Sequence, residues 1–277
     1  MSNPDGRAYL ERTKNYCWRG TGNGVDLNRN FDWEFGQKGS SSLKTDEEYR
    51  GTHAFSEPES RVFTDVSRSI NLDAFVSFHS GIRQIYIPYA DSKSKSTKRK
   101  PANSVRMLDL ARQLSRCTKH TFKYGQATNI NTYSADGTIF DYMAGQRKVP
   151  FSIVIELWGD SEKHKGKSCF DLFNPPSGDL KAVIADIHSL YVTLFSYLMD
   201  WKASRNSTSQ VSIKRFSTLD EPPFLTLTYI IVAMVLVALV LVIIQGRLPF
   251  FSWCIARRRL INLRSLSTTF SVNVLKL

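Results

Sequence analysis

An uninterrupted apolar stretch near the C-terminus most constrains what this chain can fold into. Residues 224–244 read FLTLTYIIVAMVLVALVLVII, without a charge, a glycine or a proline. At about 1.5 Å per residue, a helix of this length spans the roughly 30 Å hydrocarbon core of a bilayer. The alternative is a buried core helix, but core helices of this length normally keep one polar face. The stretch therefore predicts a single transmembrane helix over residues 224–244.

The residues that flank this stretch predict its orientation. Within about 20 residues, five basic side chains follow it and three precede it, namely Arg205, Lys214 and Arg215. The more basic side normally stays in the cytoplasm. Asn206-Ser207-Thr208 is a glycosylation sequon on the other side. We therefore expect a single-pass membrane glycoprotein with a lumenal or extracellular N-terminal part and a basic cytoplasmic tail over residues 245–277.

Charge elsewhere in the chain is unremarkable. The net charge is +12, from 37 basic and 25 acidic residues, but six of the basic residues follow Glu221, after which no acidic residue occurs. Nucleic-acid-binding domains usually combine a basic face with exposed aromatic residues, and the remaining excess of charge does not require one. We expect a membrane partner and no nucleic acid.

Residues 1–201 have the pattern of one α/β domain, followed by a polar juxtamembrane linker over residues 202–223. The short apolar runs 72–78 and 151–157 are typical of buried strands in a parallel sheet. Ser56-Glu57-Pro58-Glu59 has the spacing of a capping box, which predicts the start of a helix. Apolar residues at helical period predict three helices. They are Val62, Phe63, Val66 and Ile70 in the first; Val105, Leu108, Ala111 and Leu114 in the second; and Leu180, Val183, Ile184, Ile187, Tyr191, Leu194 and Leu198 in the third.

Two further features remain open at this level. The basic stretch 93–100 (KSKSTKRK) is interpreted as a solvated loop, with a lipid-binding or localisation role as the alternative. Cys254 lies beyond the apolar stretch, which leaves Cys17, Cys117 and Cys169 for one disulfide and one free thiol. Their spacing does not choose the pair.

Polar residues at the ends of the two apolar runs are the first candidates for chemistry, because open α/β sheets bind ligands at the carboxyl ends of their strands. His79 follows the first run, and Glu156 stands inside the second. A glutamate among apolar residues is costly to bury unless it is paired or bound. Asn28 and Arg29 form a second candidate pair, since an arginine beside an amide can hold a carboxylate. A structural or surface role is the alternative for each residue taken singly.

Taken together, these residues resemble the zinc metallocarboxypeptidases of the carboxypeptidase A-like family, over residues 3–201. The motifs that carry the resemblance are, in chain order, Asn3-Pro4-Asp5-Gly6, Trp18-Arg19, Asp26-Leu27-Asn28-Arg29-Asn30-Phe31, Tyr49-Arg50-Gly51, Ser56-Glu57-Pro58-Glu59, Ser77-Phe78-His79-Ser80, Tyr133 and Ile155-Glu156-Leu157. The resemblance implies a mixed β-sheet flanked by helices, with the first strands of the family's sheet absent from this chain. It also implies removal of the C-terminal residue from peptides or proteins.

The resemblance assigns a role to each matching residue. His79 matches a zinc ligand, Glu156 the general base, and Arg19 the cation that stabilises the oxyanion. Asn28 and Arg29 match the residues that bind the substrate's terminal carboxylate, and Tyr133 matches a mobile tyrosine that closes over the bound residue. Phe140 and Ala90 fall where the family sets its preference for the last side chain. Neither is acidic, so we expect a preference for apolar or aromatic C-terminal residues.

One part of the family pattern does not occur in this sequence. Two further zinc ligands come from a His-x-x-Glu motif upstream of Asn-Pro-Asp-Gly, and none of the five histidines has a glutamate three residues later. Catalytic zinc needs about three protein ligands. No apolar signal segment opens the chain either. We therefore expect an N-terminally truncated enzyme, with one zinc ion and its other two ligands upstream of Met1. The alternatives are a catalytically inactive, membrane-tethered peptide-binding module and a membrane-anchored interaction protein without a retained site.

Overall fold

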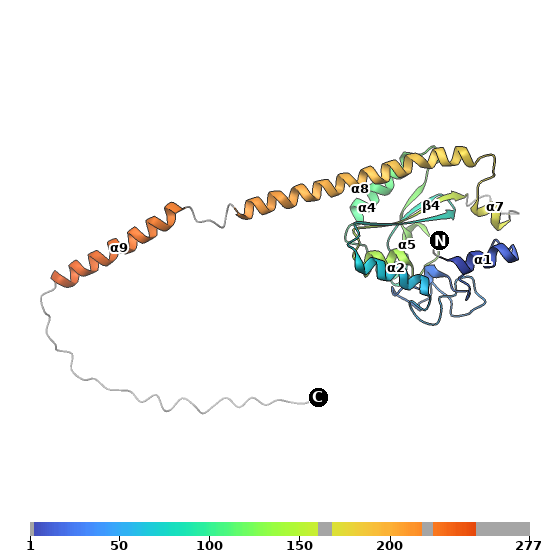
Figure 1. Ribbon diagram of the computed structural model, residues 1–277, viewed down its shortest axis with the longest axis horizontal. Coiled ribbons are helices and arrows are strands. Elements are labelled where there is room, and N and C mark those ends of the chain that lie inside the picture. Colours follow the sequence, from blue (N-terminus) through green and yellow to red (C-terminus); the bar gives the residue numbers. More distant parts are fainter. Residues whose placement is uncertain (1–2, 160–167, 218–223, 248–277) are drawn as a thin grey trace, which may run out of the picture. The chain divides into compact units, whose positions relative to one another are not determined.

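The computed structural model describes residues 3–159, 168–217 and 224–247. By its internal contacts the chain divides into two units, Met1–Ser207 and Thr208–Leu277. Within the first unit helices and short strands are interspersed along the chain (Figure 1). This part of the chain has the α/β character that the apolar runs predict.

A four-stranded mixed sheet forms the centre of the first unit. Its strands are β1 (Ala74–Gly81), β2 (Gln84–Ile87), β3 (Lys123–Gln126) and β4 (Phe151–Gly159), in the order β1-β4-β2-β3. β1 and β4 are parallel, β2 is antiparallel to β4, and β3 is parallel to β2. The two predicted strands are confirmed as β1 and β4, although β1 begins two residues later and ends three residues later than its apolar run.

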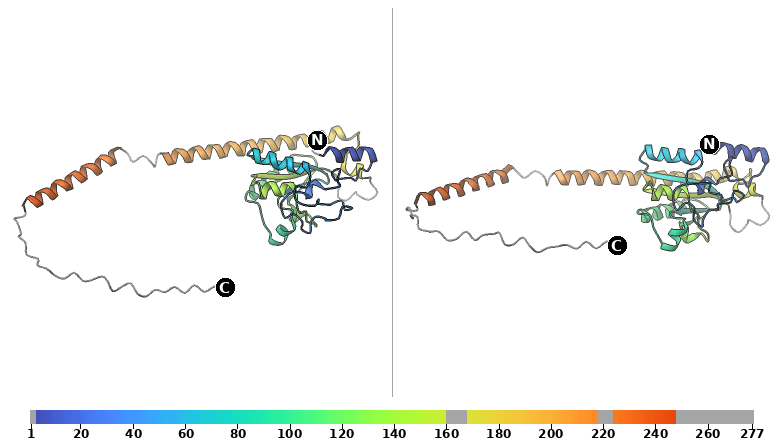
Figure 2. Two further views of the ribbon diagram at one scale, coloured as in Figure 1. Left: turned by 60° about the horizontal axis from the view of Figure 1, so that its bottom comes forward. Right: turned by 90° about the horizontal axis from the view of Figure 1, so that it is seen from below.

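Helices and one short 3₁₀ turn make up the remaining regular structure of the described residues. They are α1 (Pro4–Thr13), η1 (Leu27–Arg29), α2 (Pro58–Ser69), α3 (Ser92–Thr97), α4 (Ser104–Arg116), α5 (Ala127–Ile130), α6 (Ile139–Gly145), α7 (Cys169–Phe173), α8 (Leu180–Ser217) and α9 (Phe224–Arg247). α1 and α7 lie at the same end of the first unit in all three views (Figures 1 and 2).

Alternation along β4 separates two faces of the sheet. Phe151, Ile153 and Ile155 are fully buried in one apolar cluster with residues of α4 and α8. Val154 belongs to a second cluster, with Phe140 of α6. Because side chains alternate along a strand, Glu156 shares the face of Val154 rather than that of the α4 and α8 cluster. This alternation decides on which face a site containing Glu156 lies.

The predicted first helix is real, but its start and its buried face differ from expectation. Its N-cap is Glu57, without a side-chain capping bond, so the capping box with Ser56 as cap is wrong. Ser56 instead accepts a hydrogen bond from the buried Asn30 side chain. The buried positions of α2 are its small polar residues, while Val62 and Val66 are at least half exposed. β1 beside it is an edge strand of the described sheet.

The other two predicted helices are also present, and the apolar face of α4 is shifted, whereas Leu194 and Leu198 of α8 pack on the core as predicted. In α4 the buried positions include Met107 and Leu110, whereas Val105 and Leu108 are exposed. α8 packs on the sheet through Leu190 and Leu194, and continues to Ser217. The stretch 202–223 that was expected to be a linker is therefore helical over its first 16 residues.

The basic stretch 93–100 is more structured than the solvated loop that was expected. Residues 92–97 form helix α3. Lys93 pairs with Glu34, and the Lys95 ammonium donates to the Thr132 carbonyl. The Arg99 guanidinium lies over the rings of Trp33 and Tyr89. Three of its cations are thus used in contacts within the fold.

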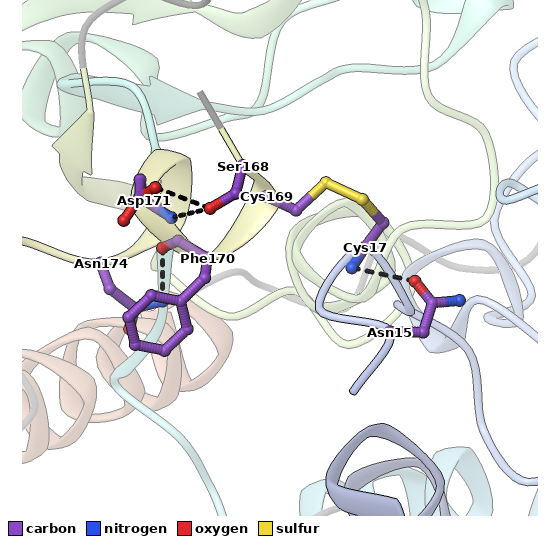
Figure 3. Close-up of a disulfide and its surroundings, with 7 residues drawn as sticks. All are labelled: Asn15, Cys17, Ser168, Cys169, Phe170, Asp171 and Asn174. Atoms are coloured by element: carbon purple, nitrogen blue, oxygen red, sulfur yellow. Dashed lines mark hydrogen bonds between the residues drawn. A yellow bond between two sulfur atoms is a disulfide. The ribbon is translucent and has the colours of Figure 1, made fainter. Parts of the chain in front are cut away.

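A disulfide joins Cys17, just after α1, to Cys169 at the start of α7 (Figure 3). The partners are 152 residues apart in sequence. Cys117 is free among the described cysteines, and Cys254 lies outside the described residues. The structure thus chooses the pair that the spacing left open.

The second unit contains α9, which carries the apolar stretch. Tyr229–Val242 is an apolar helical segment of 14 residues. Its large hydrophobic side chains are exposed in the described structure. In the described part of the chain, only the helical stretch Leu180–Asn206 is long and apolar enough by length and composition to cross a membrane. That stretch contacts the sheet cluster through Leu190 and Leu194, but most of it is exposed in the described structure. The span over residues 224–244 therefore stays a prediction.

Candidate active site

His79 and Glu156 are brought side by side by strand pairing. β1 and β4 are parallel, and His79 is the register partner of Glu156. Side chains of register partners point to the same face of a sheet. The His79 Nδ1 and Glu156 Oε1 atoms are 3.7 Å apart, and the Ser77 hydroxyl lies 3.0 Å from His79 Nε2. The two candidates from separate apolar runs thus form one polar pair.

Burial shifts both members of this pair toward their neutral forms. Desolvation raises the pKa of the Glu156 carboxyl to about 8, although the Arg19 charge opposes the shift. Desolvation also lowers the pKa of His79. A carboxyl with a raised pKa is suited to exchange protons near neutral pH, and a neutral imidazole is the form that binds metals.

Two arginines lie beside this pair and share one carboxylate. The Arg19 Nη2 atom is 2.6 Å from Asp26 Oδ2, and the Arg29 Nη1 atom is 3.8 Å from the same oxygen. The Asp26 side chain also accepts from the backbone N–H of Asn28, which caps η1. Asp26 therefore orients both arginines. Their charges act on His79, and that of Arg19 acts on Glu156 as well.

Arg29 is nearly buried, with 4% of the residue exposed, and it holds an acidic partner. Its Nη2 atom lies 2.8 Å from Glu48 Oε1, while its Nε has no hydrogen-bond partner in the structure. The Asn28 Oδ1 atom accepts from the Ile139 N–H. Asn28 therefore keeps its amide N–H groups as the donors it can offer to a ligand.

Gly137 lets the segment that carries Tyr133 and Phe140 lie against Arg29. Its φ is +75°, and a Cβ there would stand 2.3 Å from the Arg29 carbonyl oxygen. Only glycine adopts such a position without strain. The Phe31 N–H donates to the Gly137 carbonyl at 3.0 Å, which ties the two segments together.

Tyr133 lies within electrostatic range of the same groups. The residue is 58% exposed, yet partial desolvation of the hydroxyl raises its pKa, and the charges of Glu156, Arg29 and Glu48 also act on it. The preceding residue, Thr132, is held through its carbonyl by Lys95. An exposed aromatic side chain on an anchored segment can move without unfolding its surroundings.

Phe140 and Ala90 pack together on the sheet face that Val154 and Glu156 share. Both are buried in the apolar cluster that includes Tyr86 and Val154. The nearest acid in sequence, Asp141, is completely buried and accepts from the Ala90 N–H. Burial raises the pKa of Asp141 well above its ordinary value.

The described residues do not make a complete catalytic zinc site. No group of three His, Cys, Asp or Glu side chains placed to hold a metal is found among them. His79 is chemically suited to supply one ligand, but a catalytic zinc needs about three from protein.

Asp26 and Glu48 are site residues whose roles the sequence did not predict. Asp26 belongs to a motif that carries the family resemblance, but the resemblance assigned it no role. Glu48 directly precedes the motif Tyr49-Arg50-Gly51. Other motif residues prove structural: Asn30 is fully buried and bonds to Arg50, His53, Ser56, Glu57 and Ser60. A carboxylate beside Asn-Arg was the one available signal for Asp26.

The fold and site define an α/β domain with a His–Glu pair flanked by two arginines on one sheet face. The family model described as zinc carboxypeptidase, peptidase M14, matches residues 1–187. The chain belongs to the zinc carboxypeptidase family. Its carboxypeptidase A-like character agrees with its similarity to carboxypeptidase A1 of Rattus norvegicus, 34% identical over 171 residues.

A further carboxypeptidase is also similar to this chain. Zinc carboxypeptidase A 1 of Anopheles gambiae is 29% identical over 175 residues, which are 60% of this chain and 40% of that protein. The carboxypeptidase A1 match covers 57% of this chain and 39% of the relative. The chain thus spans about two fifths of the length of these relatives.

Solved structures share the fold. Carboxypeptidase A from Helicoverpa armigera has a TM-score of 0.58 at 24% identity, covering 72% of this chain and 50% of that one. Bovine thrombin-activatable fibrinolysis inhibitor in complex with tick carboxypeptidase inhibitor has a TM-score of 0.61 at 24% identity, covering 72% of this chain and 68% of that one. At these identities the likeness concerns the fold.

Proposed function

We propose that this protein is a zinc-dependent carboxypeptidase that removes the C-terminal residue of peptides or proteins. The observation that carries the proposal is the cross-strand pair of His79 and Glu156 beside Arg19 and Arg29. Family membership supports the reaction class. If zinc is held, His79 supplies one ligand and the others come from outside the described residues.

The chain's own residues divide the remaining work. Arg29 and Asn28 bind the terminal carboxylate of the substrate, which takes the place of Glu48 on the guanidinium, and Tyr133 closes over it. Glu156 accepts a proton from the attacking water on a carboxylate oxygen. Arg19, 40% exposed and held by Asp26, stabilises negative charge that develops on the carbonyl oxygen.

The role of Arg29 predicts that the protein binds free peptide acids better than peptide amides. The amide lacks the charge that forms a charge-assisted bond to the guanidinium, which is worth roughly 1.5–3 kcal/mol. We expect an N-blocked peptide acid to bind about tenfold or more tightly than its C-terminal amide, measured by calorimetry. Arg29→Gln removes this difference.

The matched control for this measurement is Arg61→Gln. Arg61 donates to the Phe55 and Ser56 carbonyls on the exposed side of α2 and does not face the site. This variant keeps the preference for the free acid. Equal binding of acid and amide by the unaltered protein contradicts the role of Arg29.

The Phe140 and Ala90 packing predicts a preference for the last residue. Both positions are apolar, and the neighbouring Asp141 carboxyl is completely buried and accepts from the Ala90 N–H. A basic C-terminal side chain therefore meets no charged partner from these residues. We expect faster hydrolysis of peptides that end in phenylalanine than of matched peptides that end in arginine. Faster release of arginine in the same assay overturns this assignment.

A second candidate function is a peptide-binding module without catalysis. The observation that favours it is the lack of three metal-binding side chains placed together in the described part of the chain. Like the enzyme, this module is expected to prefer peptide acids to amides through Arg29, but it is not expected to hydrolyse them. For both functions we propose a membrane anchor over residues 224–244, with the domain lumenal or extracellular, the tail cytoplasmic and a glycan on Asn206. The composition of the apolar stretch and its flanking charges support this arrangement.

A further inference from the structure

Glu48 contacts Arg29, the residue proposed to bind the terminal carboxylate of the substrate. The Arg29 Nη2 atom lies 2.8 Å from Glu48 Oε1. The other terminal nitrogen, Nη1, donates to the Asn28 carbonyl at 3.0 Å. The carboxylate of a glutamate and that at the end of a peptide offer the same oxygen atoms to a guanidinium. Glu48 therefore occupies a position on Arg29 that a C-terminal carboxylate needs.

Backbone hydrogen bonds on both sides of Glu48 hold this residue in place. Its N–H donates to Asp46 Oδ1 at 2.9 Å, and its carbonyl accepts from the Ser41 N–H at 3.0 Å. The next residue, Tyr49, is buried, and its carbonyl accepts from the Asp26 N–H at 2.8 Å. These bonds tie Glu48 to the segment that carries the guanidinium. The fold of the backbone therefore brings Glu48 within reach of that group.

The Glu48 side chain reaches solvent much more than that of Arg29. It is 36% exposed, whereas the Arg29 side chain is 5% exposed. In the part of the chain that the structure describes, Arg29 is the one cation within ion-pair distance of Glu48. A partly exposed carboxylate exchanges such a partner for water at a modest cost. Glu48 can therefore leave the guanidinium, whereas the buried Arg29 stays in place.

Arg29 has other contacts that hold it, so the contribution of Glu48 is mainly its charge. Nη1 of Arg29 bonds to the Asn28 carbonyl and lies 3.8 Å from Asp26 Oδ2. Arg19 and Arg29 carry two positive charges, which Asp26 and Glu48 balance with two negative charges. A buried cation is costly without a counter-charge. Glu48 thus balances the buried guanidinium whenever no other anion does.

A peptide carboxylate and Glu48 require the same nitrogen atom. Two carboxylates at one donor repel each other strongly in a partly buried site. Exchange of one for the other keeps the charge around Arg29 balanced, whereas addition of a second would leave an excess of negative charge. The charge of Glu48 also acts on Arg19 and Tyr133, the two other groups proposed to contact the substrate there. Binding of a peptide acid therefore requires that Glu48 leaves.

We propose that Glu48 is an internal competitor for the terminal carboxylate of the substrate: it pairs with Arg29 in the free protein and gives way when a peptide acid binds. This proposal rests on the proposed role of Arg29. The residue released by hydrolysis keeps the same carboxylate, so Glu48 competes with this product as well and favours its release. Glu48 thus lowers the affinity for every ligand that uses Arg29 and does not affect a ligand that makes no contact with it.

The test measures binding of N-acetyl-alanyl-phenylalanine and of its C-terminal amide to the full chain in detergent, by calorimetry. Glu48→Gln keeps the size of the side chain and removes its charge. We expect this variant to bind the acid about tenfold more tightly than the unaltered protein, because a charge-assisted hydrogen bond no longer has to be broken. Free phenylalanine, the product, is also bound more tightly. Binding of the amide changes by less than about twofold.

Glu47→Gln is the matched control, because it makes the same change of charge at the neighbouring, exposed residue. The charge of Glu47 reaches Arg19, but its carboxylate makes no ion pair with Arg29 among the described residues. This variant is expected to bind the acid as the unaltered protein does. A tightening equal to that of Glu48→Gln shows a general effect of charge and overturns the proposal.

A double variant tests whether Glu48 acts through Arg29. When Arg29→Gln is already present, Glu48→Gln is expected to have no further effect on binding of the acid, because the two residues act through one contact. Melting temperatures show which variants are folded. If Glu48→Gln does not fold, Glu48→Asp takes its place. It shortens the side chain by one methylene, weakens the contact with Arg29 and is also expected to tighten binding of the acid.

The outcomes separate this proposal from the proposed function. Tighter binding of the acid by Glu48→Gln, with Glu47→Gln unchanged, supports the competition, even if the unaltered protein binds the acid too weakly to measure. If the unaltered protein prefers the acid but Glu48→Gln binds it equally or more weakly, Glu48 is a positioning residue for Arg29 and only this proposal fails. Equal binding of acid and amide, or no binding, by both proteins overturns the role of Arg29 and this proposal with it.

Discussion

Replacing Glu156 with glutamine is expected to lower peptide hydrolysis by about 100- to 10,000-fold, the usual contribution of a general base. Glutamine has nearly the same shape but cannot accept the proton of the attacking water. The substitution is compatible with the fold because burial already favours the neutral form of this side chain, as its pKa of about 8 shows. Hydrolysis is measured as release of the C-terminal residue, with peptide binding measured on the same preparation.

The pattern of the two measurements separates the functions considered for this protein. Loss of hydrolysis with binding retained supports the enzyme. Binding without hydrolysis in every variant, the unaltered protein included, supports the peptide-binding module. If the protein shows neither peptide binding nor hydrolysis, the remaining function is that of a membrane-anchored interaction protein. Glu47→Gln is the matched control, because Glu47 is an exposed carboxylate whose charge reaches Arg19 but which lies outside the strand pair.

Removing the Cys17–Cys169 disulfide is expected to lower the free energy of unfolding of the first unit by about 2–5 kcal/mol. The bond closes a long loop, with partners 152 residues apart, and so restricts the unfolded chain strongly. For a domain of this size the loss corresponds to a fall in melting temperature of roughly 5–15 °C. The variant is Cys17→Ser/Cys169→Ser, which leaves no unpaired thiol from the bond, and melting is followed by circular dichroism.

Cys117→Ser is the matched control for this variant, since Cys117 is the free thiol among the described cysteines and packs beside the sheet cluster. It is expected to melt within a few degrees of the unaltered protein. Because Cys17 lies two residues before Arg19, the disulfide also restrains the chain next to a candidate site residue. A melting temperature that is unchanged without the Cys17–Cys169 bond contradicts its stabilising role.

Much of the sheet could be predicted from short-range patterns. Runs of apolar residues predicted β1 and β4, and the position of Glu156 within one run and of His79 at the end of the other predicted a polar site there. The pattern is clearest in β4, whose first five residues are buried, because a strand buried on both faces needs apolar residues at almost every position. The polar exceptions in such a strand then stand out.

Helix faces were less predictable. The apolar periodicity of α2 placed Val62 and Val66 on the inner face, but in the described structure these side chains are exposed and small polar residues are buried. Periodicity shows that a helix has an apolar face, whereas the surroundings decide what covers that face. The same reason explains the exposed Val105 in α4.

By itself, the sequence determined the α/β class, the family and the residue types available for the site. Only the tertiary structure decided which of them meet: Cys17 with Cys169, Arg29 with Glu48, and His79 with Glu156. Local patterns reflect the backbone's preference for helix or strand and the burial of apolar side chains. Contacts between distant residues depend on how strands pair and loops cross, and no short segment of sequence contains that information.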